Sequence, residues 1–199
     1  MEVKEIEKAR KTIEDGGIVI FPTETAYGIA ADATNEDAVE KVYEAKQRPR
    51  SKGLTAIVDS LESAEKFAYL SDAEKKIVEE FMPGPVTLVA EKKDKVPDSL
   101  NEDFAFRISS SEVADALSSG GPITATSANI SGNETSYSVE DISEGLLEKA
   151  DYVLDAGRLN SGPTSTIAEV EDDQVFIHRM GPISQEELEA VIDDVDIYS

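Results

Sequence analysis

The stretch that decides the fold is residues 21–58, FPTETAYGIAADATNEDAVEKVYEAKQRPRSKGLTAIV. A short apolar run, Ile18–Phe21, leads into it and predicts a buried strand, and residues 54–58 predict the next strand. Between them, apolar residues recur at helical spacing at Ala38, Val39, Val42 and Tyr43. A strand, a helix and a second strand in this order are typical of an α/β sheet with helices on its faces.

Charge is distributed unevenly along the chain. The 199 residues include 42 Asp and Glu but only 19 Lys and Arg, which gives a formal net charge of −23. Five cations nevertheless fall within residues 41–52, a segment with a single acid: Lys41, Lys46, Arg48, Arg50 and Lys52. A local positive potential on an acidic background suits a small, multiply charged anion. The same net charge disfavours broad electrostatic binding to nucleic acid.

Composition excludes several kinds of site. The chain has no cysteine and one histidine, His178, which excludes disulfides, zinc ribbons, thiol nucleophiles and any site that needs two histidines. We interpret His178 as structural, or as a neighbour of Arg179 in a predicted strand. The sequence contains no run of about 18 apolar residues that would span a membrane. The charged N-terminus lacks the apolar core of a signal peptide, so we expect a cytoplasmic location.

The rest of the chain continues the alternation of strands and helices and closes with a hairpin. Further strands are predicted at residues 86–90, 104–108, 123–125, 152–155, 166–170 and 175–179. Ser or Thr with an acid three residues later is typical of a helix start, and this spacing occurs at Thr34, Ser71, Ser138 and Ser184. We predict one α/β domain over residues 1–199, with an open, twisted, mixed β-sheet flanked by helices.

Four polar loops lie at the ends of predicted strands. They are PTETAYG at 22–28, KQRPRSKGL at 46–54, TSANISG at 126–132 and NSGPTST at 160–166. Ligands of open α/β sheets bind just outside strand ends, so we expect these loops to share one cleft. Their hydroxyls and cations suit phosphate or carboxylate oxygens. The sequence has no Walker loop and no GxGxxG motif, so the residues alone predict an anion site and leave its ligand open.

In this order, the motifs resemble those of the YrdC-like family of threonylcarbamoyl-AMP synthases. The resemblance rests on PTETAYG, KQRPRSKGL, PGPVTLV, FRIS, TSANISG, GRLN, and STI followed by HRMG, and it covers about Gly17 to Gly181. It is closest to the short TsaC-type members, which lack an extra C-terminal domain. The resemblance implies a YrdC-like fold and a nucleotidyltransferase that makes threonylcarbamoyl-adenylate and pyrophosphate from L-threonine, bicarbonate and ATP. It also implies a downstream transfer complex that uses the adenylate to modify tRNA.

The resemblance assigns roles residue by residue. It implies that Lys46 and Arg48 are catalytic and neutralise the phosphates. The implied ATP-binding residues are Arg48, Lys52, Arg107, Ser127, Asn129, Thr135 and Arg179. The implied threonine-binding residues are Thr25, Tyr27 and Ser165. No metal ligand is implied, and Mg²⁺ is expected to be held mainly through the ATP phosphates.

Each of these roles has a structural alternative. Thr25 and Asn129 could hold turns, Tyr27 could pack in the core, and Arg107 could form a strand-end salt bridge. Arg50 matches no motif position and is interpreted as a surface residue. Longer family members have His at the position of Ile57, so any threonine contact made there is lost or replaced.

Two other functions remain open for a chain of this fold. One is a carbamoyl-transfer domain of the kind found in hydrogenase maturation proteins, although those are embedded in much longer chains. The other is a module that binds double-stranded RNA or tRNA, or the ribosome. The net charge of −23 counts against RNA, because phosphate neutralisation supplies most of the affinity for it.

Overall fold

The computed structural model describes residues 2–172 and 174–193. The helices within these residues are α1 (Val3–Glu14), α2 (Glu36–Lys46), α3 (Leu61–Ala64), α4 (Asp72–Phe81), α5 (Glu112–Ser118), α6 (Glu144–Leu147) and α7 (Gln185–Asp193). Two 3-10 turns are η1 (Arg50–Lys52) and η2 (Val139–Asp141). None of the helices in this part of the chain is long and apolar enough to cross a membrane.

The described strands form one sheet, whose order is β7-β1-β2-β6-β3-β5-β4-β8-β9. Their bounds are β1 (Val19–Pro22), β2 (Tyr27–Ala30), β3 (Thr55–Val58), β4 (Val86–Ala90), β5 (Phe104–Ile108), β6 (Ile123–Ser127), β7 (Tyr152–Val153), β8 (Thr166–Glu171) and β9 (Gln174–Arg179). The pairs β1–β7, β3–β5 and β4–β8 are parallel and the others are antiparallel. The predicted open, mixed sheet flanked by helices is therefore confirmed, as is the closing hairpin β8–β9.

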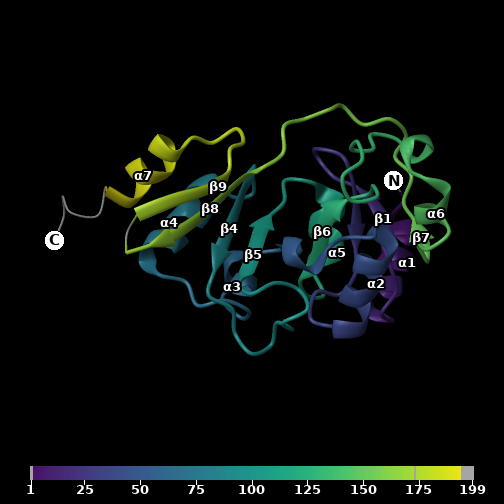
Figure 1. Ribbon diagram of the computed structural model, residues 1–199, viewed down its shortest axis with the longest axis horizontal. Helices are drawn as coiled ribbons and strands as arrows, with labels where there is room; N and C mark the ends of the chain where they lie inside the picture. The colour runs from purple at the N-terminus through teal and green to yellow at the C-terminus, as the bar shows by residue number, and fades with distance from the viewer. Residues whose placement is uncertain (1, 173, 194–199) are drawn as a thin grey trace.

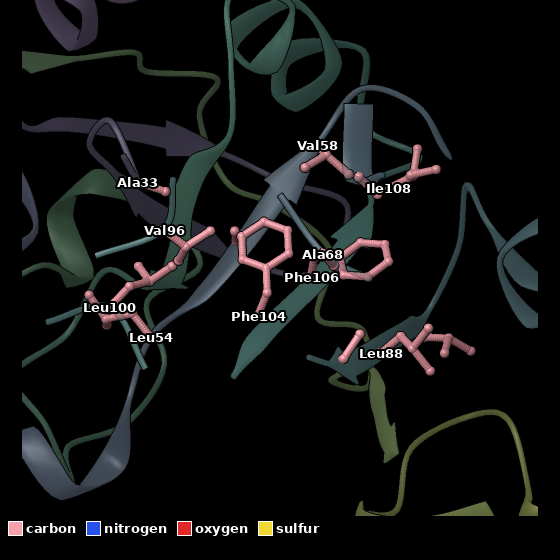
Figure 2. Close-up of a cluster of buried hydrophobic side chains, with 14 of the residues drawn as sticks. Ala33, Leu54, Val58, Ala68, Leu88, Val96, Leu100, Phe104, Phe106 and Ile108 are labelled. Carbon is pink, nitrogen blue, oxygen red and sulfur yellow. The ribbon is translucent and has the colours of Figure 1, made fainter. Parts of the chain in front are cut away.

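One face of the sheet is fully covered. Alternate strand residues such as Ile29, Val58 and Leu88 join the main core there, against apolar residues of α2, α3, α4, α6 and α7. Figure 2 shows part of this core, where the rings of Phe104 and Phe106 stack with centroids 5.5 Å apart. Because side chains alternate along a strand, the intervening residues of β5 must face the other side of the sheet.

The opposite face is covered over only part of its area. Helices α1 and α5 pack on β1, β2, β3 and β6 through a second apolar cluster that includes Ile13, Phe21 and Leu117. The remaining area, over β5, β4 and β8, carries small or polar residues such as Thr87 and Ser165. The α/β layers therefore leave one uncovered half-face, and this half-face becomes the floor of a cleft.

Ile57 lies in the second cluster and is fully buried there. It is not among the residues that line the cleft. Its side chain is packed with Leu117 of α5 and Ile123 of β6. In this chain the position contributes to packing beside the cleft.

Two predicted helix starts are wrong in detail. The hydroxyl and N–H of Thr34 both bond to Asp32, so Asn35 caps α2 by accepting from the Ala38 N–H at 3.2 Å. Ser138 does form a capping box, but it opens only η2, because Ile142 returns to an extended conformation. The capping box at Ser71 is confirmed at the start of α4, and Ser184 bonds to Glu187 at the start of α7.

A long connection crosses the molecule between β7 and β8. Residues 154–165 leave β7 at one edge of the sheet and reach β8, next to the other edge. Seven inter-strand spacings of about 4.8 Å amount to roughly 34 Å, and twelve residues extend to about 40 Å at most. This connection, which we call the strap, must therefore run nearly extended; Figure 1 shows it as the yellow-green segment along the top.

Candidate active site

The uncovered half-face opens into a cleft of about 500 Å³. The polar loops identified in the sequence all contribute to its lining, through Thr25, Arg48, Ser127 and Ser165 respectively. The prediction that these loops share one cleft is therefore confirmed. The lining residues also include Gly162 and Thr164 of the strap, which places this segment along one wall.

Lys46, the last residue of α2, lies beneath one wall of the cleft. It is 1% exposed and does not line the cavity. Its Nζ donates to the main-chain oxygen of Ser127, to that of Asn129 at 2.8 Å, and toward Asn129 Oδ1 at 3.5 Å. The Lys46 carbonyl accepts from the Ser131 N–H at 2.9 Å. The structure therefore uses Lys46 to hold the TSANISG loop from below.

The surroundings of Lys46 also change its protonation. Burial, together with the nearby charge of Arg48, lowers the pKa of the Lys46 ammonium from 10.5 to about 7. The main-chain oxygens of Ser127 and Asn129 favour the protonated form, because they can only accept hydrogen bonds. The predicted catalytic contact between Lys46 and a phosphate would require this side chain to leave its three acceptors.

Arg48 and Lys52 face the cleft from the turn that follows α2. Arg48 donates from Nε to the Gly53 carbonyl and from one Nη to the Lys52 carbonyl, both at 2.9 Å. Gly53 has a φ of +50°, and an added Cβ would lie 2.6 Å from the Asn101 side chain, so the turn requires glycine here. Lys52 is exposed, and its Nζ makes no hydrogen bond or ion pair within residues 2–172 and 174–193.

Arg50 points away from this cavity. It pairs with Glu40, and its guanidinium lies 4.5 Å from the centroid of the Tyr43 ring. It is exposed and does not line the cleft. The interpretation of Arg50 as a surface residue is consistent with this placement.

Arg107 reaches the cleft from β5 and is paired with an acid that sequence reasoning did not single out. It forms a salt bridge with Glu24 of the PTETAYG loop, whose second oxygen accepts from Ser109 Oγ at 2.7 Å. Burial acts to raise the pKa of Glu24, but the charge and hydrogen bonds of Arg107 and Ser109 outweigh it and hold that pKa below 4.5. The sequence offered one indication of this pairing: Glu24 is the single acid in the PTETAYG motif.

Ser165 and Arg179 contact each other where β8 and β9 border the cleft. Ser165 Oγ lies 2.8 Å from Thr87 Oγ1 and accepts from an Arg179 Nη at 3.1 Å, and the Ser165 carbonyl accepts from both Nε and Nη2. Burial and the charge of Arg107 lower the pKa of Arg179. An added Cβ at Gly181 would lie 2.2 Å from the Thr166 nitrogen, so glycine is required for this part of the cleft to form.

A β-bulge in β9 directs residues into the cleft. Ile167 pairs with Arg179 but the next residue of β8 pairs with Ile177, so His178 is the extra residue of the bulge. Bulges redirect side chains that would otherwise alternate. As a result both His178 and Arg179 line the cavity, and His178 Nε2 lies 2.6 Å from a carboxylate oxygen of Glu169.

Thr25 and Tyr27 both belong to the lining of the cleft, but Thr25 is half-buried and Tyr27 is buried. Thr25 lines the cleft, and its hydroxyl lies 3.1 Å from Thr23 Oγ1, which also accepts from the N–H groups of Thr25 and Ala26. Tyr27 is fully buried in the main core and also belongs to the lining of the cleft. Its hydroxyl accepts from the Ala156 N–H at 2.9 Å and donates to the Gly157 carbonyl at 2.8 Å. Tyr27 therefore anchors the strap.

The TSANISG loop presents only part of its polar surface to the cleft. Ser127 and Thr135 line the cavity, whereas Asn129 does not. The Asn129 amide donates to the carbonyls of Ile130 and Asn133, and its oxygen accepts from Ser127 Oγ. Asn129 thus holds the turn, while Thr135 has no side-chain hydrogen bond in the described part of the chain.

The lining of the cleft carries charges of both signs. Its cations are Arg48, Lys52, Arg107 and Arg179, and its acids are Glu102, Asp103 and Glu169. The hydroxyl residues Thr25, Ser127, Thr135 and Ser165 also line the cleft. Cations and neutral hydroxyl donors on a concave surface are the arrangement that phosphate and carboxylate groups require. The fold and the cleft define an open-sheet α/β protein with a binding site for an anionic ligand.

Comparison with known proteins identifies the family. The model of the Sua5–YciO–YrdC family, which carries the description telomere recombination, matches residues 11–181. This chain belongs to that family. The resemblance seen in the motifs is thereby confirmed over nearly the whole chain.

Individual relatives agree with this assignment. A protein of Methanocaldococcus jannaschii, provisionally named threonylcarbamoyl-AMP synthase, is 42% identical over 93% of this chain and 89% of its own length. The threonylcarbamoyl-AMP synthase of Pyrococcus abyssi is 34% identical over 94% of this chain, which spans 56% of that relative. The crystal structure of P. abyssi Sua5 complexed with L-threonine matches 96% of this chain and 58% of its own at 34% identity, with a TM-score of 0.89.

Proposed function

We propose that this chain is a threonylcarbamoyl-AMP synthase, which converts L-threonine, bicarbonate and ATP into threonylcarbamoyl-adenylate and pyrophosphate. The observation that carries the proposal is the convergence of four motif loops on one cleft lined by both cations and hydroxyls. Relatives that carry this name are 34–42% identical across more than nine-tenths of the chain. We further propose that residues 1–199 act as one domain.

The reaction needs positioning and charge neutralisation more than a nucleophilic side chain. The threonine amine combines with bicarbonate to give a carbamate and water. A carbamate oxygen then attacks the α-phosphorus of ATP, the bond to the bridging oxygen breaks, and pyrophosphate leaves. Negative charge builds on the phosphates in such a transfer, and cations placed beforehand stabilise it. A chain with no cysteine and one histidine can carry out this chemistry.

The placement of the side chains suggests how the two substrates divide the cleft. Arg48 and Lys52 project from one turn and would contact the phosphates, with Ser127 and Thr135 beside the nucleotide. Thr25 lies next to Gly162 of the strap and Ser165 is the last residue of the strap. Both line the cleft and would contact the threonine part. Lys46 would act from below, by keeping Ser127 in place.

Magnesium would enter the cleft with the ATP phosphates. Mg²⁺ is commonly bound through substrate phosphates and one or two carboxylates. The described residues include no group of three or more His, Cys, Asp or Glu that could hold a metal ion. The side chains therefore do not fit a dedicated metal cage, and no step above depends on one.

The product would be used by a downstream complex that modifies tRNA, and we propose a cytoplasmic location for both. Direct RNA binding by this cleft is disfavoured by its acidic side chains, Glu102, Asp103 and Glu169. RNA binding would show itself as an affinity that falls steeply with salt.

The proposal is tested by incubating the protein with ATP, L-threonine and labelled bicarbonate. We expect pyrophosphate release that requires all three substrates, together with a labelled adenylate. Reactions that lack threonine or contain serine in its place serve as controls. Pyrophosphate release without threonine contradicts the proposed function, because it indicates simple ATP hydrolysis.

A further inference from the structure

Among the four cations that line the cleft, Arg107 differs from the others in its pairing. Its guanidinium forms a salt bridge with Glu24, and the arginine and glutamate side chains are only 11% and 25% exposed. Arg48, Lys52 and Arg179 form no salt bridge with any acid in residues 2–172 and 174–193. One of the cations that line the cleft, Arg107, is therefore neutralised by an acid of the protein itself.

The Glu24 carboxylate is held by donors on one strand and the residues that follow it. One oxygen bonds to Arg107, and the other accepts from Ser109 Oγ at 2.7 Å. Ser109 is 4% exposed, so its hydroxyl is in a fixed position. A carboxylate with one oxygen on a guanidinium and the other on a hydroxyl uses the kinds of donor that an incoming substrate carboxylate or phosphate would also use.

We propose that Glu24 is an internal stand-in for a substrate oxyanion: it pairs with Arg107, and an anionic group of the substrate displaces it when that group binds Arg107. This inference rests on the proposed function, which provides two such groups, the carboxylate of L-threonine and the phosphates of ATP. Their shared chemistry is an oxygen anion that competes with Glu24 for one guanidinium. Glu24 is thus a positioning residue that sets the affinity of the site.

The consequence is that Glu24 and the substrate anion compete for Arg107, so removing the charge of Glu24 should raise the affinity for the substrate. Each substrate anion that binds Arg107 must first break a partly buried ion pair, which reduces its apparent affinity. Neutralising Glu24 while keeping its size removes that competitor. A residue that instead held the substrate's ammonium group would have the opposite effect, because its neutralisation would weaken threonine binding.

The test is isothermal titration of ATP and of L-threonine, each alone, into wild type, Glu24→Gln and Glu40→Gln. Glu40→Gln is the matched control, because Glu40 also pairs with an arginine, Arg50, but lies outside the cleft. We expect Glu24→Gln to bind one of the two ligands about fivefold more tightly, the value of an ion pair worth about 1 kcal/mol. We expect Glu40→Gln to match the wild type. The ligand that gains affinity identifies whose oxyanion binds Arg107.

Two further variants secure the result. Ser109→Ala keeps both charges but removes the hydroxyl that holds Glu24, and we expect a smaller gain for the same ligand. In the Arg107→Gln background, Glu24→Gln should have no effect on either ligand. Unchanged or weaker binding of both ligands to Glu24→Gln, with normal binding to wild type, overturns this inference alone. Failure of the wild type to bind either ligand overturns the proposed function and this inference together.

Discussion

The ammonium of Lys46 lies 2.8 Å from the main-chain oxygen of Asn129, and this hydrogen bond joins two motifs that are 83 residues apart. The lysine ends α2 and the asparagine belongs to the loop after β6. The loop in turn presents Ser127 to the cleft. Lys46, which the sequence predicts as a phosphate contact, thus holds the TSANISG loop in position at the cleft.

Replacing Lys46 with methionine tests this arrangement. Lys46→Met removes the donor to the Ser127 and Asn129 carbonyls, and a buried polar group left without its partner costs about 1–3 kcal/mol. We expect urea unfolding to show a loss of about 2 kcal/mol in the free energy of unfolding. We also expect the KM for ATP to rise about tenfold or more, because the loop loses its anchor.

The control is Lys41→Met in the same helix. Lys41 Nζ also donates to a carbonyl, that of Gly16 at 2.7 Å, but outside the cleft. We expect this variant to retain the wild-type KM for ATP. If Lys46→Met instead loses turnover at full stability, Lys46 contacts the phosphates directly, as the motif alone implies.

The titration of Lys46 makes stability depend on pH. In the folded protein its pKa is lowered to about 7, whereas the unfolded chain keeps this proton up to about 10.5. Between these values the unfolded state binds more protons, so the free energy of unfolding rises with pH. We expect wild type to gain about 1 kcal/mol per pH unit relative to Lys46→Met between pH 7 and 9. Urea unfolding of both proteins at several pH values measures this; a pH-independent difference would show that Lys46 remains protonated.

Much of the fold follows from local patterns in the sequence. The strand predicted at Phe104–Ile108 is confirmed at both ends, because its apolar residues alternate with smaller or charged ones on the open face. The burial of Lys46 also has a local signal, since it follows Val42 by four residues on the apolar face of α2. The charge cluster after this helix located the cleft correctly.

The parts that could not be predicted depend on contacts between distant residues. Nothing near Glu24 in the sequence indicates Arg107 as its partner, because β5 comes 83 residues later. The bulge at His178 requires knowing the register of β8 against β9. The covering of Ile57 by α5 depends on where that helix packs, which the helix pattern alone does not determine.

Lys52 and Arg50 form a natural pair of variants within one turn. Both are exposed cations, but Lys52 lines the cleft whereas Arg50 pairs with Glu40 outside it. We expect Lys52→Ala to raise the KM for ATP about tenfold through the loss of one phosphate contact. Arg50→Ala should leave the kinetic constants unchanged, with at most about 1 kcal/mol of lost stability. Steady-state kinetics at two salt concentrations measure the KM for ATP of both variants. Equal effects of the two variants would show that these cations act through the overall surface potential and that Lys52 makes no direct phosphate contact.

The final prediction concerns Tyr27 and the strap. Its hydroxyl bonds to the N–H of Ala156 and the carbonyl of Gly157, so Tyr27→Phe frees the start of the segment that carries Ser165. Tyr43→Phe is the matched control, because that hydroxyl donates to the Leu100 carbonyl at 3.1 Å, away from the strap. Each variant should lose about 1 kcal/mol of stability. Only Tyr27→Phe should also raise the KM for L-threonine, by a few-fold, because a looser strap positions Ser165 less well. If both variants raise that KM equally, the effect comes from general loss of stability and the strap has no part in binding threonine.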